Sequence, residues 1–326
     1  MSVAYSRFDP LFERDLWLQS RREGIGASDV SGLLNMSRWS SPMSIYLDKV
    51  GLLDADDETE AMQWGLLLEQ AIALGFERRT GLHVIEPQIV ATNSDRPWER
   101  CTLDGLVVES ETSDLDAAIG VLEIKNTSDF SWDEIPDEYA IQVQWQLGIT
   151  GHQFGWIAAL HGGRRLGIYD VTFDPRIFAT LRRVAGDFWH DHVLAKNPPA
   201  VDGESATTDA LKDAYRSLAD GTTVDLDDLG EAVLVLWLEQ KAAVKREQET
   251  LARVENQVRD LLREHTFGAH DGVELVTWKP QATAAKFDRE GLERDHPDIA
   301  AQYRGEPGTT RVLRPTKALK TKAGIA

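Results

Sequence analysis

A glutamate and a lysine interrupt the otherwise apolar start of the stretch VLEIKNTSDF, residues 121–130. Along a β-strand alternate side chains face opposite sides, so Glu123 and Lys125 share one face and Leu122 and Ile124 share the other. Such a pair on a strand is usually an exposed ion pair worth less than about 1 kcal/mol. Aimed together into a cleft, the same pair can bind a metal ion and orient a water molecule.

Two other carboxylates can join Glu123. Asp104 in TLDGL precedes a glycine, which lets backbone or ligand approach closely. If residues 101–108 pair antiparallel with 121–126, Asp104 and Glu123 stand side by side. Glu69 lies on the helix predicted over 60–81 and can supply a third acid. Three converging acids repel one another at low effective dielectric, so a cation should resolve the conflict. Oxygen ligands suit Mg²⁺ or Mn²⁺, and a pair of such ions is a common solution to phosphodiester hydrolysis.

The elements that must position these side chains follow an α/β pattern. Apolar spacing predicts helices over 15–50, broken at REGIGASDV, and over 60–81, 136–151 and 175–195. Gly81 is the expected C-cap of the second of these segments. Alternation predicts strands over 83–91, 101–109, 121–126, 154–163 and 165–173, with 101–126 forming a hairpin. We therefore expect a central mixed sheet flanked by helices.

A turn-rich segment, NPPAVDG, follows these elements and predicts a boundary near residue 200. Residues 1–200 would form a core and 201–326 a C-terminal accessory region. The latter is expected to hold a long amphipathic helix over 229–265, late strands over 273–279 and 309–315, and a basic tail. The apolar seam of the long helix repeats every seven residues, which predicts packing against another helix of the same chain rather than against a partner; its members are Trp237, Val244, Leu251, Val254, Val258 and Leu261.

The net charge of −19 argues at first against a nucleic-acid partner. The charge is unevenly spread, however, with acidic loops at 54–60 and 109–118. The tail from residue 304 has one acid, Glu306, against the basic residues Arg304, Arg311, Arg314, Lys317, Lys320 and Lys322. Because attraction depends on the local field, a basic surface on an acidic protein can still bind DNA.

The 326-residue chain has one cysteine, Cys101, which excludes an internal disulfide and an iron–sulfur cluster held by one chain. We find no secretory signal and no apolar stretch of membrane-spanning length, so we expect a reduced, cytosolic protein without a membrane partner. Trp39 is expected to pack against the protein, as most tryptophans do. The alternative for Trp39 is stacking on unpaired bases at a DNA end.

Four segments occur in an order that resembles a known family. RREGIGASDV (21–30), WGLLLEQ (64–70), TLDGL with VLEIKN, and YAIQVQWQLGITG (139–151) resemble the YqaJ-like phage recombinases, which include lambda-type exonucleases of the PD-(D/E)xK superfamily. The resemblance covers about residues 17–175. The chain departs from the superfamily motif at its proline, where Cys101, Thr102 and Leu103 stand.

The resemblance implies a PD-(D/E)xK restriction-endonuclease-like core with an appended helical C-terminal region. It also implies a role for each matching residue. The metal ligands would be Glu69, Asp104, Glu123 and the Ile124 carbonyl, with Lys125 and Gln142 as further catalytic residues. Arg21 and Ser28 would bind the 5′-terminal phosphate. Arg22 remains an alternative to Arg21, and Ser28 is also the expected N-cap of a helix.

The activity implied is a Mg²⁺-dependent 5′-to-3′ exonuclease on double-stranded DNA ends, with two ions per site and Mn²⁺ as a substitute. It would leave 3′ single strands for recombination. The resemblance further implies a ring-shaped homotrimer, a phage single-strand annealing protein as partner, and a phage or prophage protein acting in the cytoplasm of a bacterial host. Two alternatives stay open: a PD-(D/E)xK endonuclease that cuts at branches or internal sites, and a non-catalytic DNA-end-binding module.

Overall fold

The computed structural model describes residues 2–7, 13–53, 59–85, 89–216, 221–305 and 311–324. The chain divides between residues 217 and 218 into two compact units. All the residues predicted to do chemistry lie in the first unit. In the described part of the chain, no helix is both long enough and apolar enough to cross a membrane.

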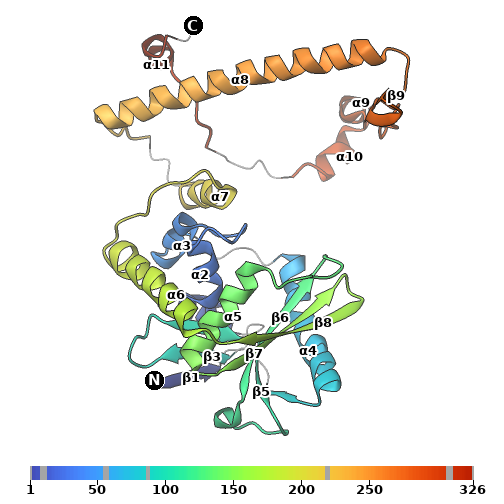
Figure 1. Cartoon of the computed structure of the whole chain (residues 1–326). Helices are drawn as coiled ribbons and strands as arrows, with labels where there is room; N and C mark the ends of the chain where they lie inside the picture. The colour runs from blue at the N-terminus through green and yellow to red at the C-terminus, as the bar shows by residue number, and fades with distance from the viewer. Residues whose placement is uncertain are drawn as a thin grey trace. The chain divides into compact units, whose positions relative to one another are not determined.

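A five-stranded mixed sheet forms the centre of the first unit (Figure 1), in the order β2-β5-β6-β7-β8. Only β6 and β7 run parallel. The strands are β2 (His83–Ile85), β5 (Gly105–Val108), β6 (Gly120–Thr127), β7 (Phe154–His161) and β8 (Arg165–Thr172). A smaller antiparallel sheet contains β1 (Val3–Arg7), β3 (Ile89–Asn93) and β4 (Arg100–Leu103). The predicted α/β architecture with a central mixed sheet is confirmed.

Helices accompany the sheets in the predicted places, apart from a helix over Ser205–Ala214 that the sequence patterns did not predict. They are α1 (Arg14–Arg22), α2 (Ala27–Leu33), α3 (Pro42–Lys49), α4 (Glu60–Thr80), α5 (Asp137–Thr150), α6 (Pro175–Phe188) and α7 (Ser205–Ala214). A short π-helical turn, Trp189–Leu194, continues α6, and a 3₁₀ turn, Leu115–Ala117, lies before β6. Helix α4 ends as predicted at Gly81, whose positive φ of 75° is the left-handed conformation of a C-cap.

The two faces of β6 pack against different helices, as its alternation predicts. Leu122 and Ile124 belong to a core cluster with Phe76 of α4, whereas Val121 belongs to the cluster that contains Trp145 of α5. The indole N–H of Trp145 donates to the Arg100 carbonyl at 3.0 Å, which ties α5 to β4. Helix α5 is thereby fixed over the face of β6 that carries Glu123 and Lys125.

Two predicted strands are each divided between the two sheets. The segment 101–109 becomes β4 and β5, with Asp104 at the break, and 83–91 becomes β2 and β3, on either side of residues outside the described part. The hairpin prediction holds for β5 and β6, where Gly105 pairs with Leu122. Alternation alone cannot reveal a change of sheet, because both halves of each segment have the composition of a strand and follow one another closely in the sequence.

The second unit contains the long helix α8 (Asp228–Leu262), the hairpin β9 (Phe267–His270) and β10 (Val273–Thr277), and three short helices, α9 (Arg289–Asp295), α10 (Pro297–Gln302) and α11 (Lys317–Lys322). The long helix and the strand over 273–279 are confirmed. The strand predicted over 309–315 is wrong for residues 311–315, which form no strand, while 309 and 310 lie outside the described residues. Strand β9 is an element that the sequence patterns did not predict.

The apolar seam of α8 lies largely open. Val244, Leu251, Val254 and Leu261 are exposed, so the described residues leave this part of the seam uncovered. The predicted packing of the seam against another helix of the same chain is therefore wrong for these four positions. The nearest packing partner of α8 is α11, where Lys322 Nζ lies 2.6 Å from the Glu231 carboxylate.

Candidate active site

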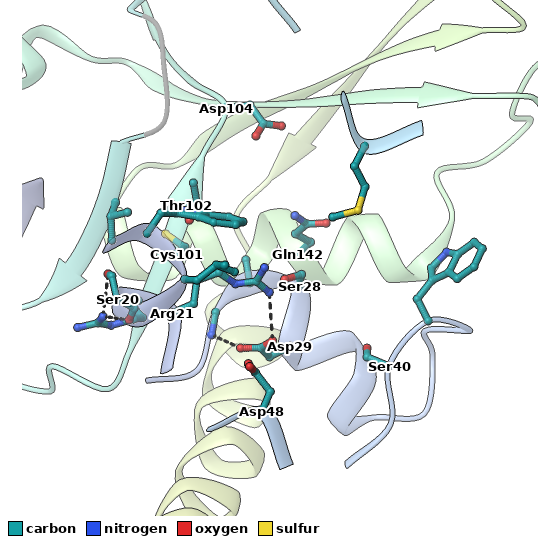
Figure 2. A pocket seen from close by; sticks show the side chains of 18 of the residues that line it. Ser20, Arg21, Ser28, Asp29, Ser40, Asp48, Cys101, Thr102, Asp104 and Gln142 are labelled. Carbon is teal, nitrogen blue, oxygen red and sulfur yellow. Dashed lines mark hydrogen bonds and ion pairs between the residues drawn. The ribbon is translucent and has the colours of Figure 1, made fainter. Parts of the chain in front are cut away.

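A pocket with a cavity volume of about 570 Å³ opens in the first unit. In the view of Figure 2, Asp104 lies at the top of the lining residues, Arg21 and Ser28 lie below it, and Gln142 lies between them. Eight of its lining residues are those that the sequence predicts, namely Arg21, Ser28, Glu69, Asp104, Glu123, Ile124, Lys125 and Gln142. Segments more than a hundred residues apart thus supply one cavity.

Glu123 and Lys125 are not an exposed surface pair. The Lys125 ammonium lies 2.5 Å from Glu123 Oε1, and the two side chains are only 23% and 2% exposed, respectively. Burial opposes the charge on Lys125, but Glu123 and Asp104 outweigh it and raise the pKa of the lysine. Lys125 is therefore a permanent cation at the pocket wall, with its ammonium 5.0 Å from the centre of the Tyr139 ring.

Asp104 projects from the break between β4 and β5 toward β6. Its Oδ2 accepts a hydrogen bond of 2.7 Å from the Ile124 N–H, which fixes the carboxyl beside Glu123. Burial, then Glu123, then Glu69 raise the pKa of Asp104 well above its usual value. The predicted electrostatic conflict among these three acids is therefore present in the fold.

The oxygen atoms of these three acids and of the Ile124 carbonyl are suitable ligands for a hard divalent cation. Carboxylate oxygens and a strand carbonyl are the ligands that Mg²⁺ and Mn²⁺ prefer, and a cation would offset the repulsion that raises the pKa of Asp104. Among the described residues, however, no three histidine, cysteine or acidic side chains are arranged to hold an ion as they stand. Glu123 has both oxygens engaged, by Lys125 and by Gln146. Coordination by Glu123 requires it to release at least one of these contacts.

Gln146 is a site residue that the sequence patterns did not predict. Its Nε2 donates to Glu123 Oε2 at 2.6 Å and to the Thr102 carbonyl at 3.3 Å, and its side chain is fully buried. It lies four positions after Gln142 on α5, so both glutamines share one helix face. This spacing is a sequence signal from which Gln146 could have been predicted. Gln144 faces elsewhere and bonds the Thr172 carbonyl and the Asp174 N–H.

Gln146→Leu is expected to weaken Mn²⁺ binding by about 10- to 100-fold, because Glu123 loses the partner that orients its carboxylate. Isothermal titration calorimetry measures this directly. Gln153→Leu is the matched control, since Gln153 is an exposed glutamine outside the pocket lining. Equal Mn²⁺ affinity of the wild type and Gln146→Leu would show that Gln146 has only a packing role.

A second charged cluster lies at the Arg21 end of the pocket. The Lys49 side chain is fully buried, with its ammonium 2.7 Å from Asp29 Oδ2 and 2.8 Å from the Arg21 carbonyl. The same Asp29 oxygen accepts the Gly26 N–H at 2.8 Å. Burial would raise the pKa of Asp29, but Lys49 and Arg21 outweigh it and lower the pKa. Asp29 and Lys49 thereby join α1, α2 and α3 beside the pocket.

The two adjacent arginines differ in their partners. Arg22 donates to Asp48 Oδ1 at 3.2 Å and to the Leu53 carbonyl at 2.7 Å. Arg21 lies over the Trp17 ring at 5.0 Å and has its guanidinium 3.8 Å from Asp29. The expectation that Ser28 caps its helix is wrong, because Gly26 occupies the N-cap and Ser28 is the second residue of α2. Ser28 is exposed and lines the pocket.

Asp29→Asn is expected to lower the free energy of unfolding by about 3–5 kcal/mol near pH 7, since Lys49 is left buried without its counter-ion. A carboxyl with a lowered folded-state pKa stabilises above its unfolded pKa, about 4, and this contribution is lost as the pH falls through the folded value. The difference between wild type and variant should therefore shrink below about pH 4. Urea unfolding across pH measures it.

Asp187→Asn provides the matched control, because Asp187 pairs with Arg183 on an exposed helix surface. Its expected cost is about 1 kcal/mol or less. If Asp29→Asn were as mild as this control, the Asp29–Lys49 pair would not hold the three helices together.

Residues 16–153 match the model of the YqaJ-like viral recombinase domain. This range contains all eight predicted site residues, and Gln146 as well.

Matches to individual relatives extend beyond residues 16–153. The chain is 29% identical over 301 residues to the uncharacterized protein YqaJ of Bacillus subtilis, covering 90% of this chain and 91% of that protein. It is 26% identical over 231 residues to the uncharacterized protein R354 of Acanthamoeba polyphaga mimivirus, covering 67% of this chain and 38% of that protein.

Solved structures also align with part of this chain. An alkaline exonuclease from Laribacter hongkongensis, LHK-Exo, aligns with a TM-score of 0.44 at 18% identity, over 56% of this chain and 94% of its own. A phage-related exonuclease from Haemophilus somnus 129PT aligns with a TM-score of 0.40 at 11% identity, over 53% of this chain and 96% of its own.

Proposed function

We propose that this protein is a metal-dependent deoxyribonuclease that digests one strand of duplex DNA from its 5′ end and leaves a 3′ single strand for recombination. One observation carries the proposal: a single pocket combines the acids Asp104 and Glu123, the partly buried cation Lys125, and the cation Arg21. Phosphodiester hydrolysis needs both kinds of group, because a water molecule must be activated and negative phosphate must be held.

The acids would hold Mg²⁺, for which Mn²⁺ could substitute, with two ions per site. The ligands would be Glu69, Asp104, Glu123 and the Ile124 carbonyl. When bound, the metal lowers the pKa of water and acts as a Lewis acid toward the phosphate. Lys125 orients the attacking water or offsets charge that develops on the phosphate oxygens, and Gln142 positions the substrate from the facing helix.

The reaction explains why a 5′-phosphate site belongs in the same pocket. Water oxygen bonds to phosphorus, and the bond to the 3′-oxygen of the first nucleotide breaks. That nucleotide leaves with its 5′-phosphate and a 3′-hydroxyl, and the next nucleotide acquires a new 5′-phosphate. Arg21 and Ser28 grip this terminal phosphate in each cycle. Arg21 is the better candidate of the two arginines, because Arg22 is held by Asp48 and the Leu53 carbonyl.

Residues 1–200 form the PD-(D/E)xK nuclease core in this proposal, and 201–326 form an accessory region. The protein assembles as a homo-oligomer, a ring-shaped trimer by family resemblance, with DNA passing through it. Such a ring reconciles a net charge of −19 with DNA binding, because its acidic residues can face outward. It acts in the cytoplasm of a bacterial host, beside a phage single-strand annealing protein.

Digestion of linear and covalently closed circular duplex DNA in Mg²⁺ tests the proposal. We expect complete digestion of linear DNA and no change in closed circles, which have no ends. Cutting of closed circles would identify an endonuclease instead. If neither DNA is cut and calorimetry detects no Mn²⁺ binding by the folded protein, the chain is a non-catalytic DNA-end-binding module.

A further inference from the structure

Trp39 lies open to solvent at the wall of the pocket. Its exposed fraction is 76%, and it is one of the residues that line the same cavity as Asp104 and Arg21. The prediction that Trp39 packs against the protein is therefore wrong. Tryptophan bodies are mostly buried in folded proteins, so this exposed indole requires another explanation. Its neighbour Ser40 is labelled at the right of the pocket in Figure 2.

The segment that carries Trp39 is anchored at both sides of the indole. The Trp39 N–H donates to the Ser37 hydroxyl at 3.1 Å. Ser41 caps α3 by accepting the Ser44 N–H at 3.1 Å, and its buried hydroxyl accepts from Thr207 at 2.7 Å. The indole is thus presented from a segment tied to α3 and α7, which reduces the entropy lost when a ligand stacks on it.

The chemistry around the indole suits a flat, anionic ligand. The Arg38 guanidinium lies over the Trp39 ring at 5.0 Å from its centre, which places a cation beside the aromatic surface. Met62, from the first turn of α4, is 48% exposed and supplies a further apolar side chain to the pocket lining. Aromatic surface next to positive charge is how proteins bind single-stranded nucleotides, with the base on the ring and the phosphate near the cation.

We propose that Trp39 is a stacking platform for an unpaired nucleobase at the DNA end. The proposal rests on the proposed function, since it takes DNA ends as the ligand of the pocket. Stacking would be valuable to this protein because its net charge of −19 limits what general attraction to phosphate can contribute. Unlike phosphate contacts, the stacking contribution should change little with salt.

Fluorescence anisotropy in EDTA tests the platform without cleavage. The probe is a labelled duplex whose terminal nucleotides are unpaired, bound by the full-length protein. We expect Trp39→Ala to weaken binding about tenfold and Trp39→Phe to retain most of the affinity, because phenylalanine keeps an aromatic face. Trp64→Ala is the matched control: Trp64 is 54% exposed on α4 and is not part of the pocket lining.

A second probe with abasic unpaired nucleotides separates stacking from other contacts. Wild type and Trp39→Ala should bind this probe equally, and the tenfold difference on the first probe should be similar at low and high salt. Equal binding of the first probe by wild type and Trp39→Ala would contradict the stacking proposal. A tenfold difference in affinity that persists on the abasic probe would contradict it as well. If both binding results are as expected but the wild type does not cleave DNA in Mg²⁺, the proposed nuclease activity is wrong while the stacking proposal holds.

Discussion

Lys125→Ala is expected to reduce the cleavage rate of linear duplex DNA at least about 100- to 1,000-fold, while DNA binding survives. The ammonium lies 2.5 Å from Glu123 Oε1 and is charged at any accessible pH, because Glu123 and Asp104 outweigh the effect of burial on its pKa. The substitution removes the cation beside Glu123, and water is expected to attack the phosphate at this position. Single-turnover digestion and anisotropy measure the two properties separately.

Loss of folding must be distinguished from loss of chemistry in this variant. Glu123 is buried, so removal of its counter-ion also destabilises the protein, by about 3–5 kcal/mol. Lys125→Gln keeps a hydrogen-bond donor near Glu123 and should fold better while remaining inactive. Lys212→Ala, which breaks an exposed pair with Asp209, is the control for an unspecific loss of charge. Parallel loss of binding and cleavage by both Lys125 variants would assign Lys125 a structural role.

Asp104→Asn is expected to abolish both DNA cleavage and detectable Mn²⁺ binding without lowering the thermal stability of the metal-free protein. An amide is a much weaker ligand for a hard cation than a carboxylate. Burial and the neighbouring Glu123 and Glu69 already disfavour the charge of Asp104, so removing that charge should relieve repulsion in the metal-free protein. The amide oxygen can still accept the Ile124 N–H.

Two measurements decide this outcome. Calorimetry with Mn²⁺ should detect binding heat with the wild type and none with Asp104→Asn. Mn²⁺ should also raise the melting temperature of the wild type but not that of Asp104→Asn. Glu109→Gln, in the exposed acidic loop after β5, should behave as wild type. Mn²⁺ binding of wild-type strength by Asp104→Asn would remove Asp104 from the ligand set.

The parts of the site that the sequence could predict are those governed by short-range periodicity. Glu123 and Lys125 face the same side of β6 because strand alternation requires it, and Asp104 meets Glu123 because adjacent antiparallel strands place them together. Gln142 was assigned from the family resemblance, and the helix predicted to carry it is confirmed. These positions depend on one strand, one pairing and one helix, each with a strong local pattern.

The parts that escaped prediction depend on tertiary contacts. The Lys49–Asp29 pair joins residues 20 positions apart on separate helices, and nothing in either segment specifies the other. Residues 101–109 look like one strand because both halves are buried, although they belong to two sheets. Trp39 was assigned to packing on the average behaviour of tryptophan, whereas its exposure depends on where the loop before α3 lies.

End-labelled DNA tests the central claim most directly. Blunt linear duplex carrying a label at either the 5′ or the 3′ terminus would be incubated with the protein, with and without Mg²⁺, and the products resolved on a gel. We expect prompt release of the 5′ label as a mononucleotide, only in the presence of Mg²⁺, while the 3′ label stays on long strands. Early release of the 3′ label, internal fragments, or equal release in EDTA would contradict it.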